Sequence, residues 1–337
     1  MEKGTLMKIF TYTYKLVYKK AFTLIELIFV VLILGIVASI GSSIIANLYK
    51  NYLLQRATYR ASFKTELAAQ QIANYLSYRI YGTTIARNPN ALTDNVYVTD
   101  PTLATDNNHT TLEWIGSDND GFSAAILPPW NGYCDINNSS STTVKTPGSN
   151  LTLADTIIQK LSQNGVSLSG TAAGDEHPAI FFRNIHYTYD DSTSPPTVWD
   201  YDPLTCMGLT PSSDTSCVST VGMTVGNTET LNFLDSPARA NKLIAEHYKL
   251  AWTAYSIRQI PNANGLFDLK LCYNYQPWEG EQLNANGCPG NENTIITNVS
   301  VFKFAESGYT FRFKLCAQEN IGEDYNISIC KEKAVVL

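Results

Sequence analysis

The chain opens with a polar and basic segment, continues with a long apolar run, and then changes to mixed and alternating patterns. Residues 27–49 contain no charged side chain, and the next charge is Lys50. At about 1.5 Å per residue in an α-helix, this run is roughly 35 Å long. A bilayer hydrocarbon core is about 30 Å thick. The pattern therefore predicts a membrane-spanning helix over residues 22–49.

The helical pattern does not stop where the apolar run ends. Residues 51–81 contain neither Pro nor Gly, and Gly82 ends the pattern. Apolar residues recur in the last turns at the spacing of one helix face, at Ala69, Ile72, Ala73, Leu76 and Ile80. We expect residues 50–82 to continue the same helix as an amphipathic segment, which must bury its apolar face against a sheet.

Residues 83–150 are rich in Asn, Asp, Thr, Ser and Pro and contain no long periodic segment. Two short apolar islands, Thr111–Ile115 and Phe122–Leu127, predict short strands between loops. A second helix is expected from Leu153 to Asn164, because Thr152 is a suitable N-cap for it.

Beyond residue 165 the pattern changes to the alternation of β-strands. One turn-rich stretch, residues 190–238, is expected to form a long surface excursion. Alternating apolar and polar residues predict strands over 179–189, 244–260, 266–275, 294–305, 309–317 and 326–336. Residues 83–337 are thus expected to form a β-rich domain. The predicted fold class is α+β, with the long N-terminal helix packed on an antiparallel β-sheet.

A basic leader precedes the apolar run, and one carboxylate lies near the start of the run. Lys19 and Lys20 end the leader, and Glu26 follows shortly after them. A carboxylate inside a membrane span costs about 2.5–3.5 kcal/mol near the bilayer centre. A secretory signal cleaved near Val37-Ala38-Ser39 and a plain signal anchor both explain the lysines and the apolar run. Neither of them requires Glu26.

The sequence Ala21-Phe22-Thr23-Leu24-Ile25-Glu26-Leu27 resembles the processing signal of type IV pilins and type II secretion pseudopilins. The resemblance implies that residues 1–21 are a leader peptide, which a prepilin peptidase removes by cutting between Ala21 and Phe22. It also implies that the new N-terminus at Phe22 is methylated. Ala21 stands where the family usually has Gly, which predicts slower cleavage.

The same resemblance implies that the N-terminal helix is an assembly element. Glu26 would pair with the Phe22 ammonium group of a neighbouring subunit. Packing between subunits would come from the aliphatic residues Leu24, Leu27, Ile28, Val31 and Leu34. The implied partners are other pilin or pseudopilin subunits, the prepilin peptidase and the inner membrane.

The C-terminal third is similar, more weakly, to J-type minor pseudopilins and W-type minor pilins. This similarity lies in the segments Tyr248–Tyr255, Asn298–Phe304 and Phe311–Cys316. It implies a minor subunit in the initiating or tip complex of a pseudopilus or type IV pilus that serves protein secretion or DNA uptake. The basic leader predicts a cytoplasmic N-terminus and a periplasmic C-terminal domain, anchored by a single span in a bacterial inner membrane.

The charge balance argues against a nucleic-acid-binding surface. The chain has 24 Lys and Arg against 30 Asp and Glu, which gives a formal net charge of −6. The leader holds five lysines and one glutamate, so its removal makes the chain more acidic. Nucleic-acid-binding domains are typically basic.

All seven cysteines follow residue 130, and six of them lie in three close pairs. In an exported domain such pairs predict disulfides, although six cysteines allow fifteen connectivities. Zinc is the alternative, but no Cys-x-x-Cys pair occurs and only four histidines are present. Cys134 is left without a near neighbour in sequence. The expected pairs are Cys206/Cys217, Cys272/Cys288 and Cys316/Cys330.

No motif for catalysis or phosphate binding is present. We therefore expect no enzyme activity, no cofactor and no metal site. Asp175-Glu176-His177 is expected to be a solvated loop. Asp118-Asn119-Asp120-Gly121 lacks the Gly and Glu that an EF-hand requires. Three acidic sequons, centred on Asn108, Asn137 and Asn326, fit bacterial glycosylation acceptors.

Two further functions compete with the assembly reading. One is a membrane-anchored adhesin or binding module, whose C-terminal domain recognises a ligand at the surface or in the periplasm. The other is an anchored enzyme, which would need a catalytic triad or an open metal site in the folded domain.

Overall fold

The computed structural model describes residues 23–124, 126, 128–170, 174–182, 202–234, 244–284, 287–321 and 325–336. The predicted leader, residues 1–21, and Phe22 lie outside these residues. The chain divides into two compact units, Met1–Gln55 and Arg56–Leu337. Helix α1 (Leu24–Ser77) begins in the first unit and ends in the second.

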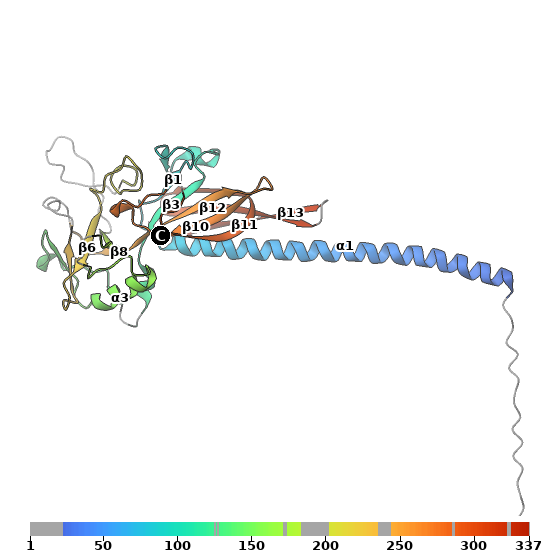
Figure 1. The fold of residues 1–337 in the computed structure, drawn as a ribbon, viewed down its shortest axis with the longest axis horizontal. Helices are drawn as coiled ribbons and strands as arrows, with labels where there is room; N and C mark the ends of the chain where they lie inside the picture. Colours follow the sequence, from blue (N-terminus) through green and yellow to red (C-terminus); the bar gives the residue numbers. More distant parts are fainter. Residues whose placement is uncertain are drawn as a thin grey trace, which may run out of the picture. The chain divides into compact units, whose positions relative to one another are not determined.

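The remaining elements belong to the second unit (Figure 1). The helices are α2 (Asn119–Ser123) and α3 (Leu151–Leu161), with short 3-10 helices at Pro101–Ala104, Ile136–Asn138 and Pro277–Glu279. The short strands are β1 (Ile85–Arg87), β2 (Asn95–Tyr97), β3 (Thr111–Gly116), β4 (Thr143–Lys145), β5 (Ala179–Phe182), β6 (Ser219–Met223), β7 (Thr230–Phe233) and β8 (Tyr248–Ala251). The longer strands are β9 (Thr253–Pro261), β10 (Phe267–Tyr273), β11 (Asn291–Ser307), β12 (Thr310–Ile321) and β13 (Tyr325–Val336).

Eight of the described strands form one antiparallel sheet, in the order β13-β12-β11-β10-β9-β3-β1-β2. We call it the main sheet. Its last strands form a meander in which apolar and polar side chains alternate, so one face is apolar. On that face Phe302 and Phe304 of β11 lie beside Phe311 and Phe313 of β12, and all four belong to the largest core. The predicted α+β fold, with a long helix packed on an antiparallel sheet, is confirmed.

The C-terminal part of α1 packs on the apolar face of the main sheet, beside β10–β13 (Figure 1). Its buried residues lie on one helix face and are mostly small: Ala57, Ala61, Thr65, Ala68, Ala69, Ile72 and Leu76. Small side chains allow the helix backbone to approach the strands closely. Ile72 and Leu76 have no exposed surface and join the phenylalanines in the core.

The helix ends at Ser77 rather than near residue 82, because the next residues are engaged elsewhere. The Ile80 N–H donates to the Ile115 carbonyl over 2.9 Å, which draws the chain toward β3. The Arg79 guanidinium donates to the Leu76 carbonyl at the end of the helix (2.9 Å) and contacts Glu306 at 2.7 Å. The buried Arg79–Glu306 pair therefore ties the helix C-terminus to the end of β11.

Residues 117–252 are an insertion between two strands that pair directly, β3 and β9. Within the insertion, β4-β7-β6-β5-β8 form a second, five-stranded sheet with its own core, which includes α3. Figure 1 shows its strands β6 and β8 apart from β10–β13. β8 ends at Ala251 and β9 begins at Thr253 in the other sheet, so the chain changes sheets across Trp252. The prediction of a single strand or bent hairpin over 244–260 is therefore wrong, because this segment forms two strands in two different sheets.

Three other local predictions are wrong in part. Phe122–Leu127 does not contain the predicted strand in its described residues, because α2 forms there with Asp118 as N-cap. The helix expected at 153–164 spans Leu151–Leu161 and is capped by Asn150 rather than Thr152. The stretch 190–238, predicted as an excursion, contributes β6 and β7 to the second sheet. Beyond Phe182, the strand predicted to residue 189 lies outside the described residues.

The six paired cysteines lie at disulfide distance in the expected combinations. The Cα atoms are 5.2 Å apart for Cys206–Cys217, 5.7 Å for Cys272–Cys288 and 4.0 Å for Cys316–Cys330. The last pair joins directly opposed positions of β12 and β13. Cys134 is buried and free, with Sγ 3.4 Å from the Ser139 hydroxyl, and burial raises the pKa of its thiol.

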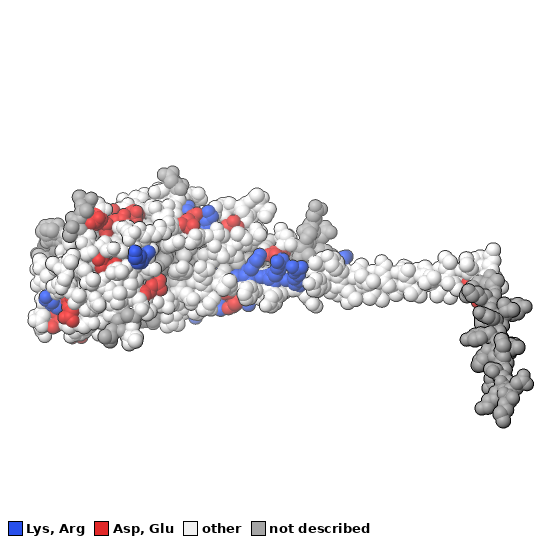
Figure 2. Space-filling model, turned by 60° about the horizontal axis from the view of Figure 1, so that its bottom comes forward, with Lys and Arg blue, Asp and Glu red and all other residues white. Residues whose placement is uncertain are grey.

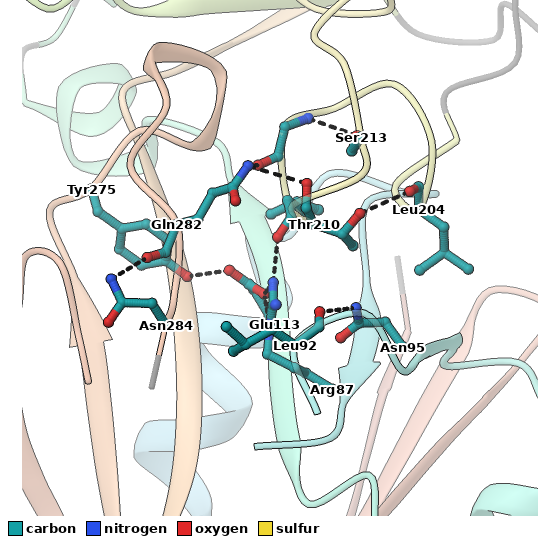
Figure 3. Close-up of polar contacts among 12 residues, drawn as sticks. Arg87, Leu92, Asn95, Glu113, Leu204, Thr210, Ser213, Tyr275, Gln282 and Asn284 are labelled. Atoms are coloured by element: carbon teal, nitrogen blue, oxygen red, sulfur yellow. Dashed lines mark hydrogen bonds and ion pairs between the residues drawn. The ribbon is translucent and has the colours of Figure 1, made fainter. Parts of the chain in front are cut away.

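A buried polar network fixes part of the insertion to the main sheet. Figure 3 shows Arg87 of β1 and Glu113 of β3 pointing toward one another, with Arg87 Nε 2.9 Å from Glu113 Oε2. The Tyr275 hydroxyl donates to the other carboxylate oxygen over 2.9 Å. Arg87 also donates to the Leu209 carbonyl, which lies in the loop closed by Cys206 and Cys217. Burial and the Glu113 carboxylate raise the pKa of Tyr275, so this hydroxyl keeps its proton.

Replacement of Arg87 by Met should destabilise the second unit strongly, because it leaves the Glu113 carboxylate buried without its cation. The expected loss is about 3–5 kcal/mol in the free energy of unfolding. The matched control is Lys314→Met. Lys314 pairs with Glu332 at 3.0 Å on the surface, and its loss should cost about 0–1 kcal/mol. Chemical denaturation of the purified protein measures both, and equal effects of the two variants would contradict this role for Arg87.

A second polar cluster holds the loop between β2 and β3. His109 Nε2 lies 3.2 Å from Asp94, and His109 Nδ1 contacts Asp106. Burial of the ring lowers the pKa of His109, but the carboxylates of Asp106 and Asp94 raise it by more, so the net pKa lies above its ordinary value. The charged imidazolium is therefore favoured in the folded state.

This raised pKa sets the direction of a pH effect on stability. The folded-state pKa of His109 exceeds the unfolded value of about 6.5. The contribution of the His109 cluster to the free energy of unfolding is therefore fully present below about pH 6.5. It is lost as the pH rises through the folded-state pKa. Thermal unfolding from pH 5 to 9 should show this decline in the parent protein and a flatter profile in His109→Gln. Identical profiles would show that His109 does not make this contribution.

Candidate functional site

The first part of α1 is an apolar rod whose side chains are exposed. Between Leu24 and Leu48 no side chain is buried in the structure. Leu24, for example, is 79% exposed. By length and composition, α1 is long and apolar enough to cross a membrane. Figure 2 shows this part of the helix free of charge over most of its length. Such a surface requires a lipid or protein environment.

The helix begins at a polar pair that the structure places in its first turn. The Glu26 N–H lies 3.4 Å from the Thr23 hydroxyl oxygen, and the Leu27 N–H donates to the Thr23 carbonyl over 3.1 Å. Thr23 and Glu26 thus have the spacing of a capping box. This spacing is a sequence signal for the helix start that is separate from the processing motif. The carboxylate also lies where the helix dipole favours a negative charge. Glu26 therefore suits the start of the helix, and the subunit contact remains a prediction.

The predicted packing residues lie on one side of this helix. Leu27, Ile28 and Val31 lie three, four and seven residues after Leu24, which places the four side chains in a single stripe. At about 100° per residue, Glu26 lies on the opposite side from this stripe. The two predicted contacts therefore use different faces of the helix. Phe22 and Ala21, which define the predicted cleavage, lie outside the described residues.

The second unit carries basic residues on the first turns of its part of α1. Arg56, Arg60 and Lys64 are exposed and recur every four positions, with no acidic residue between them. Lys64 lies 3.3 Å from Glu319 of β12. Glu66 contacts Lys331 and Lys333 of β13 (3.3 and 2.5 Å), and hydrogen bonds from these two lysines lower the pKa of its carboxyl. Surface ion pairs thus line both sides of the buried helix face.

In the part of the chain that the structure describes, the acidic motifs noted in the sequence do not converge on a reaction site. Asp118 is buried and uses its carboxylate to accept hydrogen bonds from the Gly121 N–H and the Trp130 indole (2.9 Å each). His177 Nδ1 contacts the Ser167 carbonyl at 2.9 Å. Burial, with the nearby carboxylates of Glu281 and Glu279, raises the pKa of Glu176 to about 7. Among the described residues, no group of three or more His, Cys, Asp or Glu is arranged to hold a metal ion.

Comparison with known proteins finds one match, at the N-terminus. Residues 17–42 match the family model described as the prokaryotic N-terminal methylation motif. No curated protein and no solved structure matches the chain. The matched segment covers the end of the predicted leader and the first part of α1, where the exposed apolar rod begins. The chain therefore carries the N-terminal methylation motif of type IV pilin-like proteins, a structural class, on a helix that fits a single-pass membrane anchor.

Proposed function

We propose that the protein is a minor pilin or pseudopilin, which assembles through the first part of α1 into a pseudopilus or type IV pilus. One combination supports this function above all. The methylation motif at residues 17–42 opens an exposed apolar helix whose only charge before Lys50 is Glu26, and the same α1 continues without a break onto an antiparallel sheet. A secretory signal or a simple anchor requires neither the motif nor Glu26.

In this proposal a prepilin peptidase cuts between Ala21 and Phe22 and methylates Phe22. Glu26 then pairs with the Phe22 ammonium group of the next subunit. Two charges about 4 Å apart attract by roughly 4 kcal/mol at an effective dielectric near 20, and desolvation offsets part of this. The main consequence is that the pair fixes the axial register of neighbouring helices. In any other register the carboxylate is unpaired in an apolar bundle, which is unfavourable. The stripe of Leu24, Leu27, Ile28 and Val31 packs against a different neighbour.

The insertion supports a place at the tip or in the initiating complex, as in J-type minor pseudopilins and W-type minor pilins. It adds a second sheet and core to the domain that follows α1. A bulky domain at the tip leaves the stacking of later subunits unhindered. The leader lysines favour a cytoplasmic N-terminus, and the three cysteine pairs suit an oxidising periplasm. Such a subunit would serve a protein-secretion or a DNA-uptake apparatus.

The test is the variant Glu26→Gln, because Gln is also accepted in a capping box and only the charge is lost. The helix and its membrane insertion should persist. Recovery of the variant in cross-linked complexes with neighbouring pilin subunits should fall about tenfold, which corresponds to the loss of about 1.4 kcal/mol of pairing.

The matched control is Ser43→Ala in the same helix. The Ser43 hydroxyl donates to the Ile40 carbonyl of its own helix over 2.9 Å, so its loss should leave recovery unchanged. Equal recovery of Glu26→Gln and the parent protein would contradict the assembly role of the charge.

A second function, an anchored adhesin or binding module, is favoured by a groove that lies between the end of α1 and the insertion. The two functions predict different phenotypes. Loss of the filament or of secretion in an unprocessed mutant supports assembly. Intact filaments with lost adherence support the binding module.

A further inference from the structure

Two adjoining hollows lie where the end of α1 meets the start of the insertion. The first has a volume of about 390 Å³ and the second about 280 Å³, and Tyr78, Ser117 and Asn119 line both. Small-molecule sites generally have volumes of about 300–1,000 Å³. We call the two hollows together the junction groove.

The floor of the junction groove is fixed by hydrogen bonds between separate elements. The Ser117 N–H donates to the Tyr78 carbonyl over 2.8 Å, and the Asp118 N–H donates to the Leu250 carbonyl over 2.7 Å. The buried Asp118 carboxylate accepts from the Trp130 indole over 2.9 Å. These contacts join the end of α1, the start of the insertion and β8. The groove is therefore preformed rather than assembled by a ligand.

Aromatic side chains supply much of the groove surface. Tyr78 is 42% exposed and Phe122 is 38% exposed. Phe122 packs edge-on against Trp130 with ring centroids 5.0 Å apart, and Tyr75, another lining residue, packs against Tyr255 at 5.3 Å. The exposed Phe122 ring is thus held in place by the buried Trp130 ring, which lowers the entropy cost of stacking a ligand on it.

The rest of the lining is polar and comes from both sides of the groove. Amide side chains can donate and accept hydrogen bonds at the same time. Charged lining residues of both signs are present, so the groove has no cluster of cations suited to a phosphate or another anion. These polar and charged lining residues include Gln71, Asn74, Asn119, Asn131, Asp120 and Lys249.

We propose that the junction groove binds a neutral oligosaccharide, with neighbouring sugar rings in the two hollows. A sugar ring has an apolar C–H face, which suits an aromatic side chain, and a rim of hydroxyl groups, which suits amides and carboxylates. The two exposed rings, Tyr78 and Phe122, and the Asn, Gln and Asp side chains of the lining supply both kinds of contact. The proposal does not rest on assembly into a filament.

The test uses the full-length protein in a detergent without sugar headgroups. A panel of neutral di- and trisaccharides of glucose, galactose, mannose and N-acetylglucosamine is screened by saturation-transfer NMR, and the best binder is titrated. Trp130 and Trp252, which line the groove, provide a fluorescence signal for the titration. At least one saccharide should bind saturably.

Three variants separate binding at this groove from other effects. Tyr78→Ala and Asn74→Ala should each weaken binding about tenfold. Asn74 is exposed on α1, and alanine favours a helix, so the second variant keeps the fold. Tyr309→Ala, at a position 58% exposed and not among the lining residues, should bind as the parent does. Absence of binding by every saccharide, or unchanged affinity in both groove variants, would overturn the proposal.

Discussion

The contact between the C-terminal part of α1 and the apolar face of the main sheet is the interaction on which the second unit depends. Ile72 and Leu76 lie fully buried among the phenylalanines of β11 and β12. Burial of one such side chain contributes about 1.5–3 kcal/mol. The small residues along the same face allow this depth of packing. Because α1 is one continuous helix, the element that packs on the sheet is also the element that carries the methylation motif.

The insertion shows how the sheet supports added structure without loss of its core. Strands β3 and β9 pair directly, so residues 117–252 do not interrupt the order of strands in the main sheet. The insertion then brings its own sheet and core, and the chain returns through Trp252. The buried pair of Arg87 and Glu113 reaches from the main sheet to the disulfide loop of the insertion. The insertion supplies the extra domain volume that favours a place at the filament tip. It also supplies one wall of the junction groove.

The parts of the fold that the sequence predicted are those with a short-range signal. The charge-free run, the stripe through Ile72 and Leu76, and the alternation of the last strands each follow from neighbours a few residues apart. The methylation motif is also local, since its leader lysines, Phe22 and Glu26 lie within a few residues of one another. These elements needed no knowledge of tertiary contacts.

The missed parts depend on contacts between distant residues. Nothing near Arg87 in the sequence indicates that Glu113 and Tyr275 will surround it. The change of sheets at Trp252 was missed because an alternating pattern continues through it and does not specify the partner strand. The Phe122–Leu127 island was misassigned because the Asp118 cap outweighs its apolar composition. The junction groove combines residues from α1, α2 and β8, so it exists only in the folded domain.

The central claim is that the chain is processed as a pilin and then assembles through α1. The most direct measurement is the mass-spectrometric N-terminus of the protein purified from its own membrane. The account predicts an N-terminus at Phe22 carrying one N-methyl group. An intact Met1, or an N-terminus beyond Ala38, would contradict it and leave an anchored or secreted β-rich domain.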